Sequence, residues 1–213
     1  MILAIYCAGG LGSEIYGLAR CVNRWEQIIF VDDVTDDKFC CGAPVFRFDE
    51  IEQFRGNIEF IIASGEPMGR AQLYNKIKAA GYTLTSIVIP EAMGANVQIG
   101  EGCIVFDCSI STNITVASNV LINSKVIIGH DVNIGEHCVI GCLCFVGGHA
   151  NLAERVYVAP GTMIKDRVSI GADAILALGA VILRSVKEKA IMLGNPARKI
   201  GENTEHSVFD MFH

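Results

Sequence analysis

This 213-residue chain contains no apolar run long enough to cross a bilayer, and its first residues lack the basic flank of a signal peptide. Aromatic residues make up only 8% of a sequence that is 51% hydrophobic, so we expect a core of aliphatic side chains. With 17 basic and 23 acidic side chains the net charge is −6, which disfavours nonspecific nucleic-acid binding.

The nine cysteines form no Cys-x-x-Cys pair, so the sequence predicts no zinc cluster. Their odd number, without an export signal, predicts reduced thiols and a cytoplasmic protein with no membrane partner.

An internal repeat of six residues dominates the second half of the chain. Every sixth residue is Ile, Val or Leu over fourteen consecutive repeats: Ile104, Ile110, Val116, Ile122, Ile128, Ile134, Ile140, Val146, Leu152, Val158, Ile164, Ile170, Leu176 and Ile182. The residue after each is usually Gly or Ala. A period of six matches neither a helix nor a single strand. It is typical of a parallel β-helix in which three hexapeptides make one triangular coil, with each repeated aliphatic pointing inward.

One coil of this helix takes 18 residues, so positions 18 apart should lie about 4.8 Å apart on the surface. One such column contains His130, Gly148, Asp166 and Arg184, and the next contains Asn113, Asp131, His149 and Arg167. His130 follows the inward Ile128 by two residues, at a corner, and should therefore point outward. An earlier repeat displaced by one residue, Ile99-Gly100, indicates that the helix begins near residue 95.

Residues 1–93 have a different pattern, in which short apolar strands alternate with helices. Strands are expected over residues 2–7, 28–31, 59–63 and 84–89, and helices over 14–22 and 70–80, which predicts a small Rossmann-like parallel sheet. Polar or glycine-rich segments follow three of these strands, as expected for nucleotide binding: Gly9, Gly10, Leu11 and Gly12; Asp32 and Asp33; Ser64 and Gly65. The glycines do not match a full dinucleotide fingerprint, so NAD is not predicted.

The sequence therefore predicts an α/β nucleotide-sugar-binding domain over residues 1–93, a β-helix over 94–200 and a tail over 201–213. The segments Ile5-Tyr6-Cys7-Ala8-Gly9-Gly10-Leu11-Gly12 and Val31-Asp32-Asp33, the hexapeptides and the closing Gly194-Asn195-Pro196-Ala197-Arg198 together resemble the sialic-acid O-acetyltransferase-like family. This family of hexapeptide-repeat sugar acyltransferases includes bacterial N-acetyltransferases of nucleotide-linked 4-amino sugars. The resemblance covers roughly residues 1–200.

The resemblance implies a left-handed β-helix, a homotrimer and acetyl-CoA bound between neighbouring β-helices. It also implies a catalytic base at the start of a hexapeptide, where Gly129-His130-Asp131 matches, and backbone N–H groups one coil further on, at Gly147 and Gly148, for the acetyl carbonyl. His130 and Asp131 are thus the expected catalytic pair. Leu11 stands where members often carry histidine, and His149 stands where no histidine is expected.

His149 lies one coil beyond Asp131, where it could pair with Asp131, contact substrate or act as the alternative base. The other histidines are expected to be structural or near CoA (His137) or solvated in the tail (His206 and His213).

The segment 155–200 carries eight basic side chains and three acidic ones (Asp166, Asp173 and Glu188), a bias that suits an anionic ligand or a solvated face. We expect the CoA phosphates to meet four of these basic side chains, Lys165, Arg167, Arg184 and Arg198.

These observations favour an acetyl-CoA-dependent N-acetyltransferase for a nucleotide-linked amino sugar in bacterial surface-glycan biosynthesis, such as that of O-antigen polysaccharide. No metal is expected as a cofactor. The same His-Asp pair could instead O-acetylate a sugar such as sialic acid. A zinc carbonic anhydrase on this fold would need three histidines with a closer spacing than the sequence has. A non-enzymatic accessory protein that binds sugar nucleotides is disfavoured by the His-Asp pair and the glycine-rich coil above it.

Overall fold

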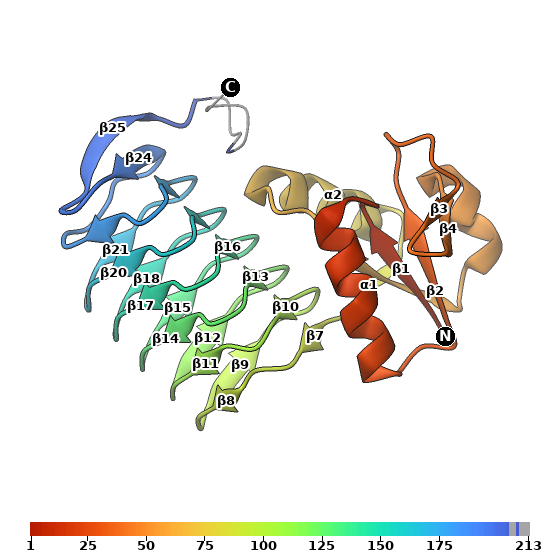
Figure 1. Ribbon diagram of the computed structural model, residues 1–213, viewed down its shortest axis with the longest axis horizontal. Coiled ribbons are helices and arrows are strands. Elements are labelled where there is room, and N and C mark those ends of the chain that lie inside the picture. The colour runs from red at the N-terminus through yellow and green to blue at the C-terminus, as the bar shows by residue number, and fades with distance from the viewer. Residues whose placement is uncertain (205–207, 209–213) are drawn as a thin grey trace.

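The computed structural model describes residues 1–204 and Val208, so the predictions for His206 and His213 fall outside the described residues. Two parts lie side by side, an α/β unit and a long coil of short strands (Figure 1). Among the described residues, no helix is both long enough and apolar enough to span a membrane.

The N-terminal part is a six-stranded sheet in the order β3-β4-β2-β1-β5-β6. Its strands are β1 (Ile2–Tyr6), β2 (Gln27–Val31), β3 (Phe39–Cys40), β4 (Ala43–Phe46), β5 (Ile58–Ile62) and β6 (Thr83–Leu84). All pairs are parallel except the β3-β4 hairpin at the edge. The helices are α1 (Gly10–Val22), the 3-10 helix η1 (Phe48–Phe54) and α2 (Pro67–Ala79). The predicted parallel sheet is present, and the hairpin and η1 are additions that the sequence pattern did not predict.

Alternating residues of β1 give the sheet two apolar faces. Leu3 and Ile5 are buried with Ile15 of α1, while Ala4 and Tyr6 are buried on the other face with Ile77 of α2. The two helices therefore cover opposite faces of the sheet. Since β1 lies between β2 and β5, the segments that follow these three strands share one edge.

The second part is a parallel β-helix with three faces. The first face contains β7 (Ile87–Val88), β10 (Ile104–Val105), β13 (Leu121–Ile122), β16 (Val139–Ile140), β19 (Tyr157–Val158), β22 (Ile175–Leu176), β24 (Ala190–Leu193) and the antiparallel β25 (Arg198–Glu202). The second contains β8 (Ala92–Met93), β11 (Ser109–Ile110), β14 (Ile127–Ile128), β17 (Phe145–Val146), β20 (Met163–Ile164) and β23 (Val181–Ile182). The third contains β9 (Val97–Ile99), β12 (Ile114–Val116), β15 (Asn133–Ile134), β18 (Asn151–Leu152) and β21 (Ser169–Ile170).

The predicted hexapeptide core is observed with one exception. The repeated aliphatics from Ile110 onward form a single buried stack. At the start of the series, however, Val105 points into this stack and Ile104 packs against the N-terminal part. Strand pairing places Val105 opposite Ile122, 17 residues away, so the register slips by one residue between Val105 and Ile110. Ile99 and Val105 keep the six-residue spacing.

The β-helix begins earlier than the repeat indicates. The segment expected as one strand over residues 84–89 is divided, because β6 pairs with β5 in the sheet whereas β7 pairs with β10 in the β-helix. The first coil thus starts at Ile87. Its inward side chains are Val88, Val97 and Ile99, whereas Met93 is exposed, so this terminal coil lacks the regular pattern.

The N-terminal part packs on the first face of the β-helix. Ile104, Leu121 and Val139 project outward from that face into one apolar cluster with Leu3 and Ile15. Two corners of the triangle border the first face. The third corner, between the second and third faces, lies opposite the N-terminal part.

Candidate active site

His130 and Asp131 lie at this opposite corner, between β14 and β15. The His130 Nδ1 atom lies 2.6 Å from a carboxylate oxygen of Asp131. The His130 side chain is 56% exposed, so the rest of its ring is open to a substrate. Hydrogen bonding, above all with His130, lowers the pKa of Asp131. Because an ionised carboxylate only accepts hydrogen bonds, Nδ1 carries a proton, so in the neutral imidazole the free lone pair is on Nε2.

A ladder of corner residues holds Asp131 in place. Asn96, Asn113, Asp131 and His149 occupy the same corner in successive coils, and all have a left-handed backbone with φ of 57° or 58°. Asn113 Nδ2 donates to the second carboxylate oxygen of Asp131 at 3.1 Å, and Asn96 donates to Asn113 at 3.0 Å. Asparagine and aspartate tolerate this backbone conformation better than most residues. Asn113 is a site residue that the sequence analysis did not identify, although the 18-residue column contains it.

The glycines at the next coil allow close approach to His130. A Cβ atom on Gly148 would lie 3.0 Å from His130 Nε2, and one on Gly129 would lie 2.7 Å from the Gly148 nitrogen. A Cβ atom on Gly147 would overlap the backbone at Asp166. The predicted oxyanion segment therefore lies against the imidazole ring. Among the described residues, the Gly148 N–H has no backbone or side-chain acceptor.

His149 joins the same cluster from one coil further on. Its backbone N–H donates to the His130 carbonyl at 2.9 Å. The two imidazole rings are nearly perpendicular with centroids 5.0 Å apart, and His149 Nε2 lies 3.9 Å from Asp131 Oδ2. The structure thus brings His130, Asp131 and His149 together.

The predicted CoA residues lie further along the same edge. Lys165 and Arg167 are exposed one coil beyond Gly147–His149, where the Arg167 N–H donates to the Gly148 carbonyl. Arg184 lies on the following coil and lines a pocket of about 500 Å³ with Arg198 and Lys199. A strip with many basic side chains therefore extends from the His130 corner to the end of the β-helix.

The predicted nucleotide segments meet at one edge of the N-terminal sheet. Gly9 is the residue before α1, and Gly9 and Gly10 have open space on the side where a Cβ would lie. Gly12 is buried against the Cys7 carbonyl, where a Cβ would overlap it, and Leu11 is half-buried beside it. The glycine at position 12 is therefore required by packing, and the two before it leave the turn accessible.

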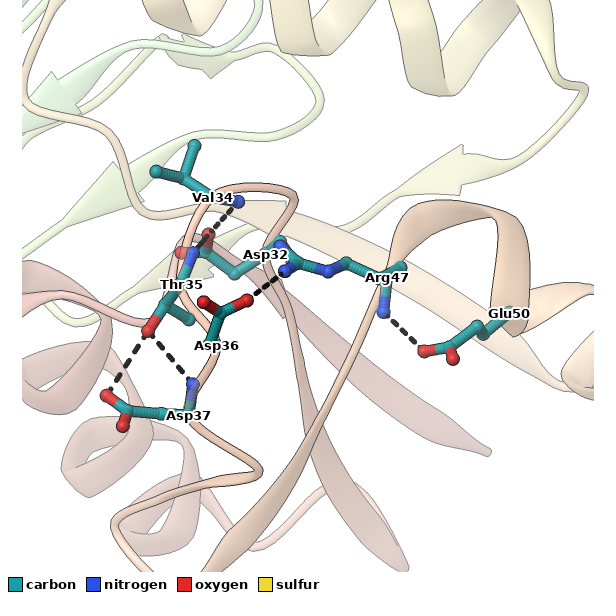
Figure 2. Close-up of polar contacts among 7 residues, drawn as sticks. All are labelled: Asp32, Val34, Thr35, Asp36, Asp37, Arg47 and Glu50. Carbon is teal, nitrogen blue, oxygen red and sulfur yellow. Dashed lines mark hydrogen bonds and ion pairs between the residues drawn. The ribbon is translucent and has the colours of Figure 1, made fainter.

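Asp32 organises this edge through its backbone contacts. One carboxylate oxygen accepts the Ala8 N–H at 2.8 Å, and the other accepts the N–H groups of Val34 and Thr35 at 2.8 and 3.0 Å. Figure 2 shows the carboxylate turned into its own loop, with Arg47 bonded to Asp36 beside it. Burial of the Asp32 carboxylate acts to raise its pKa, but the three backbone hydrogen bonds that it accepts lower the pKa overall.

Asp33 does not lie with Asp32. Its carboxylate accepts hydrogen bonds from the Tyr6 hydroxyl, from Lys76 Nζ at 2.6 Å and from the Phe48 N–H at 3.0 Å, all on the α2 face of the sheet. Neighbouring residues at a strand end point in opposite directions, which separates the two carboxylates. Ser64 and Gly65 follow β5 at the predicted edge, where Ser64 Oγ accepts the Glu66 N–H at 3.2 Å.

The polar network around Arg70 could not be predicted from the sequence, because an arginine in a helix is usually at the surface. Arg70 of α2 is fully buried, and its five N–H groups face five oxygens: the carbonyls of Ile62, Ser64, Gly102 and Asn119 and the side chain of Asn119. Burial lowers the pKa of Arg70 to about 10. Arg70 therefore fastens the Ser64 segment to the β-helix.

Residues 2–77 match a family model described as the PglD N-terminal domain. Over almost its whole length, the chain is similar to a variant of perosamine N-acetyltransferase from Caulobacter crescentus, solved in complex with CoA and GDP-perosamine. Identity is 24%, the TM-score is 0.88, and the match covers 95% of this chain and 98% of that chain. WeeI from Acinetobacter baumannii is 26% identical with a TM-score of 0.87, over 94% of this chain and 100% of that chain.

The acetyltransferase domain of PglB from Neisseria gonorrhoeae, solved with acetyl coenzyme A, is 22% identical with a TM-score of 0.61, over 93% of this chain and 98% of that chain. These likenesses confirm the predicted fold, a small Rossmann-like sheet followed by a left-handed β-helix. They also confirm the predicted resemblance. The chain has, from the N-terminal sheet to the last coil, the fold of the hexapeptide-repeat sugar acyltransferases.

Proposed function

We propose that this protein transfers the acetyl group of acetyl-CoA to an amino group on a nucleotide-linked amino sugar, with His130 as general base. The observation that carries the proposal is the oriented pair of His130 and Asp131, with Gly148 against the free side of the ring. The similarity to acetyltransferases solved with CoA, acetyl-CoA and GDP-perosamine supports the same chemistry.

In the reaction, the amine nitrogen attacks the carbonyl carbon of the thioester while His130 Nε2 takes a proton from the nitrogen. Asp131 stabilises the imidazolium that forms, as the acid does in a catalytic triad. The carbonyl oxygen becomes an oxyanion, for which the Gly148 N–H is the available donor. The carbon–sulfur bond then breaks, the amide remains, and the CoA thiolate takes the proton from His130. General base catalysis of this kind contributes ~10²–10⁴ in rate.

The two substrates fit different parts of the molecule. We assign the nucleotide sugar to the edge formed by Gly9, Gly10 and Asp32 with Ser64-Gly65, where the N-terminus of α1 favours phosphate. We assign the CoA phosphates to the basic strip that ends in the pocket of Arg184 and Arg198. The acetyl end would then lie toward His130, three coils or roughly 14 Å from the level of Arg184.

The position of His130 favours an active site shared between subunits. Within one chain, the His130 corner is opposite the face that carries the nucleotide-binding part. A sugar held by one subunit can therefore reach the base of a neighbour more directly than its own. Ile127, Phe145 and Met163 form a column of exposed apolar side chains on the second face, beside His130. We propose that this column packs in a homotrimer.

We further propose that the reaction takes place in the cytoplasm during synthesis of a bacterial surface glycan such as O-antigen. The nine cysteines are all free thiols in the structure. The similar solved structures come from bacteria, and one of them was solved with a sugar nucleotide, GDP-perosamine.

The test is release of free CoA thiol from acetyl-CoA in the presence of UDP-, dTDP- and GDP-linked 4-amino sugars. The proposal predicts turnover with at least one of them and a product that gains one acetyl group as an amide, identified by mass spectrometry and NMR. An ester product from a hydroxyl sugar, with no turnover of any amino sugar, would replace the proposal by O-acetylation. Absence of turnover with both classes would refute acetyl transfer.

A further inference from the structure

The mechanism above uses His130 and Asp131 and leaves His149 without a role. Yet the three side chains form a compact set of metal-ligand groups: a ligating atom from each lies within 4.8 Å of the others. Among the described residues, this is the one group of three or more such side chains close enough to share an ion.

The backbone holds these groups firmly while leaving them accessible. Asp131 and His149 occupy equivalent left-handed corners of adjacent coils, and the His149 N–H bonds the His130 carbonyl at 2.9 Å. The side chains of His130, Asp131 and His149 are 56%, 38% and 41% exposed, so an ion from solvent can reach all three. Asn113 already holds one oxygen of Asp131, which leaves Oδ2 directed at both imidazoles.

We propose that His130, Asp131 and His149 bind one divalent transition-metal ion of the Zn²⁺ class, and that the bound ion inhibits the enzyme. Two imidazole nitrogens and one carboxylate oxygen are the donors of an open zinc site, with a fourth position left for water. Mg²⁺ and Ca²⁺ prefer oxygen ligands and are not expected to compete. Asn113 would orient the carboxylate from outside the ligand set, as hydrogen-bonding partners of metal ligands commonly do.

The ligand atoms need only small movements to surround the ion. Zinc–nitrogen and zinc–oxygen bonds of ~2.0–2.2 Å in a tetrahedral site place the ligand atoms roughly 3.3 Å apart. His130 Nδ1 and Asp131 Oδ2 are now 2.6 Å apart, and His149 Nε2 lies 3.9 Å from the same oxygen. All three ligand atoms lie within 4.8 Å of one another, so side-chain movements of up to about 1.5 Å bring them to this spacing.

Inhibition follows because the ion replaces the hydrogen bond that orients His130 and draws Asp131 away from the imidazolium. This consequence rests on the proposed function, whereas metal binding itself does not. The ion would act as a reversible brake on acetyl transfer, with no part in the reaction.

Binding is measured by equilibrium dialysis of the reduced protein against Zn²⁺, and the ligand type by the electronic spectrum with Co²⁺. We expect one ion per chain at this site, with a tetrahedral spectrum lacking a thiolate-to-metal charge-transfer band. Loss of one ligand in His149→Asn should weaken binding at least about tenfold, since loss of even an outer partner costs 10–100-fold. Glu136→Gln, which removes an exposed carboxylate elsewhere in the β-helix, is the matched control and should bind as the wild type does.

Unchanged zinc binding in His149→Asn, or a thiolate band in the Co²⁺ spectrum of the bound ion, would overturn the proposal by placing the ion on cysteines. The activity arm separates this inference from the proposed function. Chelator-treated enzyme should turn over acetyl-CoA and lose activity as Zn²⁺ is added, with recovery after chelation. A protein that binds zinc at this site but is inactive after chelation would refute the proposed acetyltransferase activity and leave the zinc site standing. An active enzyme that zinc binding leaves unaffected would refute the inhibition.

Discussion

Replacing His137 by asparagine should remove a large part of the acid sensitivity of the folded state. His137 is buried at a corner of the β-helix that borders the N-terminal part, with its ring edge-on to Tyr74 at 5.2 Å. Its Nδ1 atom lies 3.0 Å from the Asn119 side-chain nitrogen. The backbone of His137 is left-handed, with φ of 62°, a conformation that asparagine tolerates well.

The neighbours of His137 require it to be neutral. The Arg70 guanidinium has only N–H donors, so the oxygen of the Asn119 amide must face it, at 2.7 Å. The amide nitrogen of Asn119 then faces His137 Nδ1, which must accept. If His137 were protonated, its Nδ1–H group would face the N–H group of the Asn119 amide, and neither could accept a hydrogen bond. Burial, followed by the positive charges of Arg70 and Arg155, lowers the pKa of His137 to about 4.

The pH dependence follows from the difference between the folded and unfolded states. An unfolded histidine titrates near pH 6.5, so between about pH 6.5 and 4 the unfolded chain binds a proton that the folded chain does not. The stabilisation is therefore complete above about pH 6.5 and is lost as the pH falls toward 4. A difference of about 2.5 pKa units corresponds to about 3 kcal/mol of unfolding free energy.

The assay is denaturant unfolding at fixed protein concentration between pH 7.5 and 4.5, for the wild type, His137→Asn and the matched control His149→Asn. His149 is an exposed histidine at an equivalent left-handed corner. The wild type and the control should lose stability in parallel, whereas His137→Asn should lose about 2–3 kcal/mol less over this range. Equal pH dependence in all three proteins would refute the inference that His137 is held neutral in the folded state by its contact with Asn119.

Three further predictions concern glycines and the assembly. Gly12→Ala should lower stability by about 1–3 kcal/mol because its Cβ would overlap backbone, whereas Gly17→Ala in the same helix has open space and should raise it by about 1 kcal/mol; thermal unfolding checks both. Gly148→Ala should lower kcat about 10²-fold by displacing the His130 ring, with little change in Tm. An unchanged kcat would show that catalysis does not require glycine at position 148. Gly10→Glu should repel the nucleotide phosphate, and mixed assemblies of Gly10→Glu with His130→Asn should regain activity that neither variant has alone; inactivity of proven mixed assemblies would place the site within one subunit.

Much of the fold could be predicted because the six-residue period is imposed directly by the triangular coil. The inward position that recurs every six residues carries Ile, Val or Leu from Ile110 to Ile182, so the pattern is visible in the sequence. It fails at Ile104, because the N-terminal part covers the outer side of this strand and apolar residues are needed on both faces. It also fails in the terminal first coil, where Met93 is exposed. Burial on both sides hides which of Ile104 and Val105 points inward.

The proximity of His130, Asp131 and His149 could be predicted because residues about 18 positions apart lie on neighbouring coils. A residue's place in the site could not be predicted where it depends on the direction of a single side chain. Asp32 and Asp33 are chemically equivalent neighbours, and only the strand geometry sends Asp33 to Lys76 on the far face. The role of Arg70 depends on carbonyl groups of loops distant in the sequence, for which no local pattern exists.

The most direct test of the central claim is the steady-state kcat of His130→Asn at saturating acetyl-CoA and nucleotide sugar, measured beside His149→Asn. The account predicts a fall of at least ~10²-fold for His130→Asn, with both substrates still bound, because the general base is lost. His149→Asn should retain much more activity, since the pair of His130 and Asp131 remains intact. Near-normal kcat in His130→Asn together with collapse in His149→Asn would contradict the account and move the base by one coil.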